Sequence, residues 1–193
     1  MEKRNDRKTR AEIFMKYVFC LMLALLVVSC TGAAPFHPST GDGNDRPDDF
    51  RVEYEWHEGS LPPPYHYEYT VVFTPSGRSE IVVVPDYPSA NVPTWSESFE
   101  VGERDLDALH RLMVKNGLFS RKWRRSDAVP VGGSRQTLVV TAQGKQIRVD
   151  DPLVPEQQAP AQAIHSAVRE LVPKEIWERL QTRRQRYMQE HSR

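Results

Sequence analysis

The chain has 193 residues, two cysteines and equal numbers of basic and acidic side chains, 26 of each. Residues 1–30 contain six of the basic and three of the acidic side chains, so the remainder carries a net charge of −3, the wrong sign for a nucleic-acid-binding protein. Both cysteines, Cys20 and Cys30, also lie in that first stretch, which leaves residues 31–193 without a disulfide, a thiolate metal site or a cysteine nucleophile.

An apolar run of thirteen residues, from Tyr17 to Ser29, follows the basic residues Arg10 and Lys16. A helix that crosses a bilayer needs about 20 residues, so this run is too short to be a membrane-spanning anchor. Its N-terminal position and its basic flank argue against a buried core helix as well. The length and the flank are typical of the apolar core of a secretion signal.

The run ends in Val27, Val28, Ser29 and Cys30, and these four residues resemble the lipobox of a bacterial lipoprotein signal peptide. In that family an aliphatic residue lies three positions before the cysteine, and a small residue lies just before it. The resemblance implies cleavage before Cys30 and covalent attachment of a diacylglycerol and an N-acyl chain, such as palmitate, to Cys30. Two or three such chains hold a protein stably on a membrane. We expect no other cofactor and no metal.

The resemblance implies an extracytoplasmic protein, anchored to a membrane of the cell envelope. Thr31 rather than Asp follows Cys30, which in a Gram-negative cell implies the periplasmic face of the outer membrane. Met1 and Met15 could each start a signal of this kind, and both starts give the same mature N-terminus at Cys30.

Three parts of the chain are therefore expected: a signal peptide at 1–29, a lipidated cysteine with a flexible linker at 30–49, and a single domain at 50–193. The linker is rich in Gly, Pro, Asp and Ser and poor in core-forming residues. A flexible segment of this length has a root-mean-square reach of roughly 25 Å. The linker is expected to let the domain stand a short distance off the membrane.

Alternating apolar and polar residues predict four strands in the first half of the domain, at 50–56, 65–73, 80–84 and 95–101. The first two carry aromatic residues on one face, which we expect to be the main packing face. The continuous apolar run 81–84 predicts a strand that is covered on both faces. Prolines at 62–64 cannot donate to a strand ladder, so they separate the first strand from the second.

Apolar residues recur with the period of a helix at 103–116, which Gly117 is expected to close in a left-handed conformation with Leu118 as its apolar companion. A hairpin is expected at 135–141 and 146–150, followed by a helix after the Pro-rich link at 151–160 and a last helix that begins near Pro173. Because the strands occur as hairpins rather than alternating with helices, the predicted class is α+β, an antiparallel sheet of about six strands packed by helices.

Aromatic residues in the first half of the domain admit two interpretations. An exposed platform would stack on sugar rings or dock a peptide, whereas strict alternation with charged residues favours a core face. We expect Trp95 to be the most exposed, because it borders a loop. The residues concerned are Tyr54, Trp56, Tyr65, Tyr67, Tyr69 and Trp95.

Residues 62–65 match the PPxY pattern, which aromatic-lined grooves bind as a polyproline helix. Such readers are mainly eukaryotic and intracellular, in conflict with an export signal. The favoured interpretation is a stiff loop between two strands that projects as a rigid contact.

His57 and His66 flank this loop and would approach each other if their strands pair, with Glu55, Glu58 or Glu68 nearby. Two histidines and a carboxylate could form a metal site. The spacing is unspecific, however, and histidines on the surface of strands are the favoured interpretation.

Two further features have ordinary structural explanations. Residues 132–134 are too short for a phosphate-binding loop and precede a strand, and Ser134 lacks the motif of a nucleophilic serine. The arginines of the last helix could touch anionic lipid head groups, although a solvated helix end, which favours cations, is the simpler interpretation. They are Arg179, Arg183, Arg184, Arg186 and Arg193.

The order of elements from about Tyr65 to Leu180 resembles emfourin, a small proteinaceous inhibitor of thermolysin-type metalloproteases. The residues that carry the resemblance are Leu109, Leu112, Gly117, Leu118, Phe119, Gly132 and Gly133. They are packing and turn residues, so the resemblance concerns the fold and implies no inhibitory site. It implies a domain that binds a protein, with a protease among the candidates.

No nucleophile motif, metal cluster or carboxylate pair stands out, so we predict a non-enzymatic binding module of the cell envelope rather than a hydrolase. Its expected partners are the membrane, through the lipid anchor, and an envelope protein. The alternative is an inhibitor of a secreted or periplasmic metalloprotease. The residues expected to contact the partner are Leu61, Pro62, Pro63, Pro64, Tyr65 and Trp95.

Overall fold

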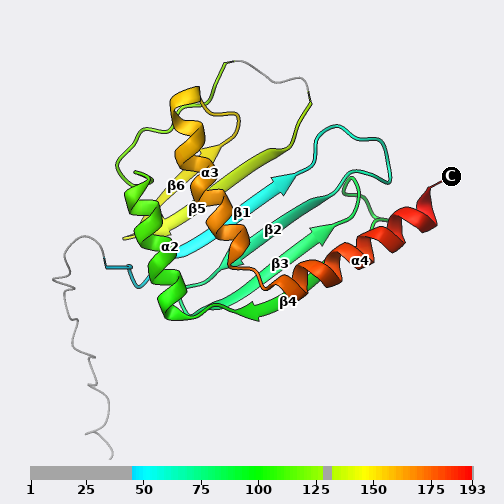
Figure 1. Ribbon diagram of the computed structural model, residues 1–193, viewed down its shortest axis with the longest axis horizontal. Coiled ribbons are helices and arrows are strands. Elements are labelled where there is room, and N and C mark those ends of the chain that lie inside the picture. Colours follow the sequence, from blue (N-terminus) through cyan, green and yellow to red (C-terminus); the bar gives the residue numbers. More distant parts are fainter. Residues whose placement is uncertain (1–44, 128–131, 193) are drawn as a thin grey trace, which may run out of the picture. The chain divides into compact units, whose positions relative to one another are not determined.

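The computed structural model describes residues 45–127 and 132–192, which form six strands and three helices (Figure 1). Every neighbouring pair of strands is antiparallel, in the order β4-β3-β2-β1-β5-β6. The predicted α+β class is therefore confirmed. The elements are β1 (Arg51–His57), β2 (Glu68–Phe73), β3 (Arg78–Val84), β4 (Trp95–Glu100), α2 (Glu103–Lys115), β5 (Arg135–Ala142), β6 (Lys145–Asp150), α3 (Pro155–Glu170) and α4 (Lys174–His191).

Strand β1 lies inside the sheet, where it pairs with β2 on one side and with the much later β5 on the other. Tyr54 is thereby placed opposite Val71 of β2 and Leu138 of β5. All three side chains are buried under the helices. The alternation read from the sequence therefore does mark the packing face of these strands.

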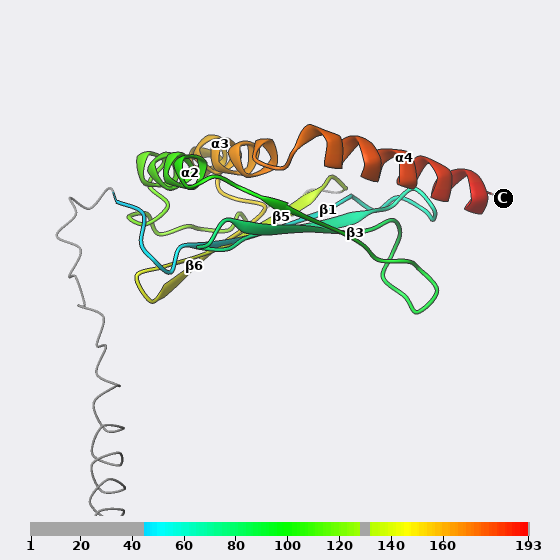
Figure 2. The same cartoon turned by 90° about the horizontal axis from the view of Figure 1, so that it is seen from below.

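All three helices cover the same face of the sheet and leave the other face open (Figure 2). This arrangement corrects the expectation that the run 81–84 is covered on both sides. Ile81 and Val83 point toward the helices and are buried, whereas Val82 and Val84 lie on the open face and are only partly buried.

Helix α2 shows how local sequence sets the ends of an element. Leu106, Leu109 and Met113 are its buried apolar stripe. The amide of Gly117, at φ 75°, donates to the carbonyl of Val114, and the amide of Leu118 donates to that of Met113, each at 2.9 Å. This pair of bonds is a Schellman motif. The predicted closure by Gly117 and Leu118 is confirmed.

Two element boundaries differ from the prediction. Strand β2 begins at Glu68 rather than at 65, because the amide of Tyr65 turns back to donate to the carbonyl of Pro62 at 2.9 Å. Helix α3 begins at Pro155, inside the stretch expected to be a link, since proline fits the first position of a helix. Among the described residues, no helix combines the length and the apolar character needed to cross a membrane.

Candidate functional site

The residues of the predicted lipidation site, Val27, Val28, Ser29 and Cys30, lie outside the described residues. The lipobox and the lipid anchor stay predictions. The predicted contact loops, in contrast, are described in full.

Antiparallel pairing brings two loops to one end of the sheet. His57, at the end of β1, lies opposite Glu68, at the start of β2, and Glu68 in turn lies opposite Val84, at the end of β3. The connection from β1 to β2 (58–67) and the connection from β3 to β4 (85–94) therefore emerge beside each other.

These two loops carry the exposed large apolar side chains found in the described part of the chain. Leu61 is 41% exposed, Tyr65 46% and Tyr87 42%. Pro62 and Pro63 lie between the first two and are exposed as well. We call Leu61, Pro62, Pro63, Tyr65 and Tyr87 the contact surface.

Hydrogen bonds hold the contact surface in place. The Tyr87 hydroxyl donates to the carbonyl of Leu61 at 2.9 Å and so ties the two loops together. The amide of Leu61 donates to the carbonyl of Gly59 at 2.7 Å. From helix α4, Nη2 of Arg184 donates to the carbonyl of Tyr65 at 2.9 Å. Loops that are held in place before a partner binds lose less conformational entropy on binding.

Two residues predicted to be contacts are buried, which corrects that part of the prediction. Trp95 is only 9% exposed, because it points toward the helices at the start of β4. There its ring packs edge-on against Tyr187 of α4, with the guanidinium of Arg183 at 5.2 Å from its centre. Pro64 is also buried.

The aromatic residues of β1 and β2 form a packed cluster rather than a platform. The rings of Trp56 and Tyr69 stack with centroids 5.3 Å apart, and the ring of Trp177 meets Tyr69 edge-on at 5.1 Å. Burial raises the pKa of Tyr69 to about 12. The core interpretation is confirmed for Tyr54 and Tyr69, which are buried, while Trp56 and Tyr67 are partly buried and Tyr65 is exposed.

The arginines of α4 are largely engaged within the domain. Arg179 and Arg183 lie 3.0 Å and 3.6 Å from the carboxylate of Glu97. The guanidinium of Arg184 lies 3.7 Å from the centre of the Tyr67 ring. Arg193 lies outside the described residues, and lipid binding by this helix end stays a hypothesis.

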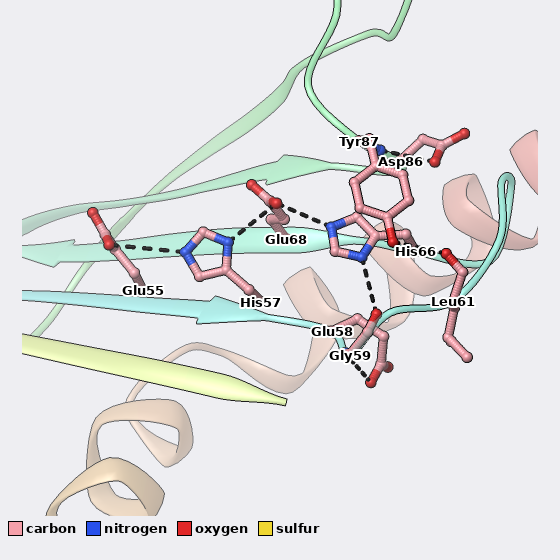
Figure 3. A network of polar contacts seen from close by, with 9 residues as sticks. All are labelled: Glu55, His57, Glu58, Gly59, Leu61, His66, Glu68, Asp86 and Tyr87. Carbon is pink, nitrogen blue, oxygen red and sulfur yellow. Dashed lines mark hydrogen bonds and ion pairs between the residues drawn. The ribbon is translucent and has the colours of Figure 1, made fainter. Parts of the chain in front are cut away.

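A histidine–carboxylate network lies at the base of the two loops (Figure 3). His57 Nδ1 and His66 Nε2 approach the same oxygen, Oε1 of Glu68, at 3.1 Å and 3.0 Å. Burial acts to raise the pKa of Glu68, but the hydrogen bonds from His66 and His57 outweigh it and hold that pKa below its ordinary value. The two histidines approach each other as the sequence suggested. The favoured interpretation of surface histidines on strands is wrong for His66, which is buried and lies in the loop before β2.

Metal binding is a separate question for this network. Within residues 45–127 and 132–192, no group of three His, Cys, Asp or Glu side chains is arranged to hold a metal ion.

A cleft of about 750 Å³ lies beside the network, between α3, the loop at Gly59 and the start of β5. His165 of α3 lines it and is 1% exposed, and its Nε2 has no hydrogen-bond partner among the described residues. Burial and the positive charge of Arg169 lower the pKa of His165 to about 4. Asp151 also lines the cleft, and burial and the charge of Asp150 raise its pKa.

Sequence reasoning missed Tyr87 and His165. For Tyr87 a signal was available, since an aromatic residue between Pro85 and Pro88 in a loop has no strand or helix to bury it. His165 occurs within an apolar helical stripe, and nothing in the pattern separates it from an ordinary core histidine. Comparison with models of known protein families and with curated protein sequences finds no match to this chain.

Proposed function

We propose that this chain is a lipid-anchored, extracytoplasmic binding module of the cell envelope, without enzymatic activity, that binds a protein through the contact surface. The observation that carries the proposal is the gathering of Leu61, Tyr65 and Tyr87 on two adjoining loops. Large apolar side chains grouped on a surface mark interaction sites in monomeric proteins. Aromatic side chains are also enriched where binding energy is concentrated.

The position of the contact surface relative to the start of the domain supports this proposal. The carboxylate of Asp49 accepts hydrogen bonds from the amides of Gln143 and Gly144, at 2.7 Å and 2.6 Å, in the turn between β5 and β6. That turn lies at the start of β1, whereas the contact surface lies beyond its end. Asp49 and the contact surface therefore lie at opposite ends of the sheet.

Site-specific photo-crosslinking in envelope membranes tests the protein-binding part. A photoreactive residue in place of Tyr65 should form a covalent product with a partner that mass spectrometry identifies. The matched control is the same residue in place of Lys145, which is exposed at the start of β6, at the opposite end of the sheet. If position 145 gave the same products as position 65, or if Tyr65 gave none, the contact surface would not be the binding site.

Fatty-acid labelling tests the anchor. Cys30→Ala should abolish incorporation of labelled palmitate and release the protein from membranes, because it removes the acceptor thiol. The chain offers its own control, since Cys20→Ala changes the other cysteine and should leave labelling intact. Labelling that persists in Cys30→Ala would remove the lipoprotein assignment.

The second candidate function is inhibition of a secreted metalloprotease. The observation that favours it is the bracing of 61–65 by Gly59, Tyr87 and Arg184, since a preformed loop loses little entropy on entering a cleft. Purified full chain would be assayed against a thermolysin-type protease. Inhibition that Leu61→Ser weakens would support this candidate, and full protease activity at saturating chain concentration would eliminate it.

A further inference from the structure

In the network of His57, His66 and Glu68, the geometry around His66 determines how many ring protons it needs to satisfy its contacts. His66 is only 3% exposed, and its two ring nitrogens face two different acceptors. Nε2 lies 3.0 Å from Oε1 of Glu68, and Nδ1 lies 3.3 Å from the carbonyl oxygen of Gly59 (Figure 3). The backbone carbonyl can only accept a hydrogen bond, and so can an ionised carboxylate.

His66 therefore makes both hydrogen bonds only when both of its ring nitrogens carry protons. A neutral ring has one N–H and one lone pair, so one of the two contacts becomes a lone pair facing an oxygen. The lowered pKa of Glu68 agrees with an ionised carboxylate at this place. His57 does not share the requirement: its Nδ1 lies 3.1 Å from Glu68, but its Nε2 lies 3.9 Å from Glu55, beyond hydrogen-bond distance.

The surroundings of the pair are mixed in charge. The carboxylates of Glu55, Glu58 and Glu68 come from β1, the residue after it, and β2. Tyr87 and the buried Asp86 come from the loop after β3, with Asp86 accepting from the amide of Tyr87 at 2.8 Å. The basic groups are Arg135, opposite His57 on β5, and Arg184, bound to the carbonyl of Tyr65.

His66 is connected to the contact surface by two routes. Its ring stacks on Tyr87 with centroids 3.9 Å apart and planes 3° from parallel, and the hydroxyl of Tyr87 donates to the carbonyl of Leu61. Through Nδ1 it also reaches the carbonyl of Gly59, which accepts the amide of Leu61 at 2.7 Å. Loss of the Nδ1 bond frees Gly59, and a shift of the ring after loss of the bond to Glu68 disturbs the stack on Tyr87; each of these residues positions Leu61.

We infer that protonation of His66 orders the contact surface. When both ring nitrogens of His66 carry protons, both hydrogen bonds are made and the two loops are held together. When the ring is neutral, His66 releases one of its acceptors. Histidine as a residue type changes charge between about pH 5 and 8, which sets the two pH values to compare. The effect of this switch on partner binding rests on the proposed function, whereas the ordering of the loops does not.

Amide hydrogen exchange on the full chain in detergent micelles tests the inference without any partner. Protection factors, which correct for the intrinsic pH dependence of exchange, are measured for the amides of Leu61 and Tyr65 at pH 5.5 and pH 8. One hydrogen bond corresponds to a change of about three- to tenfold, with higher protection at pH 5.5. The internal reference is the amide of Gly144, bonded to Asp49 at the other end of the sheet.

Three variants complete the test. His66→Gln cannot be protonated and should remove the pH difference at Leu61 and Tyr65, whereas His191→Gln, which removes a histidine at the exposed end of α4, should keep it. Tyr87→Phe breaks only the bond to Leu61 and should reduce the pH difference at Leu61, which keeps the inference testable if His66→Gln does not fold.

Two outcomes would overturn the inference: equal protection at both pH values in the unmodified chain, or a pH difference that persists in His66→Gln. The proposed function is judged separately, by crosslinking at Tyr65. If protection of the loop amides depends on pH but Tyr65 crosslinks no partner, the switch is supported and the proposed function is rejected. If Tyr65 crosslinks a partner but protection does not depend on pH, the proposed function is supported and the switch is rejected.

Discussion

Acid should destabilise this domain through His165, a residue buried in the sheet-facing side of α3. Its ring lies 5.3 Å from that of Tyr54, and burial together with the Arg169 guanidinium lowers its pKa to about 4. The unfolded chain takes up a proton at this side chain near pH 6.5. Between those values the unfolded state binds more protons than the folded state, so the free energy of unfolding falls as the pH falls.

The size of the effect follows from the two pKa values. At about 1.4 kcal/mol for each tenfold difference in proton affinity, the gap between 6.5 and about 4 corresponds to roughly 3 kcal/mol. About 2 kcal/mol of this is already lost at pH 5. For a domain with a free energy of unfolding of about 5–15 kcal/mol, a loss of this size is readily measured.

Urea unfolding of the full chain at pH 7, 6, 5 and 4.5 measures the effect. His165→Leu cannot be protonated, so the free energy of unfolding of this variant should depend less steeply on pH, whatever the substitution does to packing at pH 7. His191→Gln serves as the control and should follow the unmodified chain, since His191 is exposed. Parallel pH profiles for the unmodified chain and His165→Leu would show that His165 is protonated in the fold, and the argument from burial would fail.

Two further changes test how the loops are held. Arg184→Ala removes the cation over the Tyr67 ring and the donor to Tyr65, and should lower the free energy of unfolding by about 1–2 kcal/mol in urea titrations. The control is Arg179→Ala, which removes an exposed ion pair with Glu97 and should lower it by less than about 1 kcal/mol. Equal losses in the two variants would mean that the contact of Arg184 with the Tyr67 ring contributes nothing to stability. Gly59→Ala would place a Cβ 2.9 Å from the backbone oxygen of Gly133 and should lower the melting temperature by several degrees, through about 1–3 kcal/mol of strain. In Gly102→Ala the new Cβ meets only a side-chain oxygen at 3.4 Å, so a melting temperature lowered as much as in Gly59→Ala would contradict the steric argument.

The loop at 61–65 could be predicted from the sequence, because proline has no backbone N–H to donate to a neighbouring strand. Prolines at 62–64 cannot pair in a sheet, so a projecting loop follows from the residues alone. Tyr65 was assigned to a strand by its parity, but its amide is bonded to Pro62, and its side chain is exposed as a result. Trp95 was expected to be exposed because it borders a loop; its position on the inward face of β4, under α4, buries it.

For the His57–His66 network, the pairing of strands supplies information that the sequence alone does not. His57 and His66 are nine positions apart, and their neighbours Glu55, Glu58 and Glu68 are equally plausible partners from the sequence. The register of β1 with β2 places Glu68 directly opposite His57, and that choice decides which carboxylate both rings share. Tyr87 joins them from a loop that only the pairing of β2 with β3 brings near.

Local patterns in the sequence are enough to give the order of the elements and most of their ends, because alternation, helical period, proline and glycine act over a few residues. The Schellman closure at Gly117 and the order of strands and helices are of this kind. Tertiary packing accounts for three other features: all three helices cover one face, Trp95 is buried, and Leu61, Tyr65 and Tyr87 meet on one surface. These depend on contacts between residues far apart in the chain, whose energies no local pattern records.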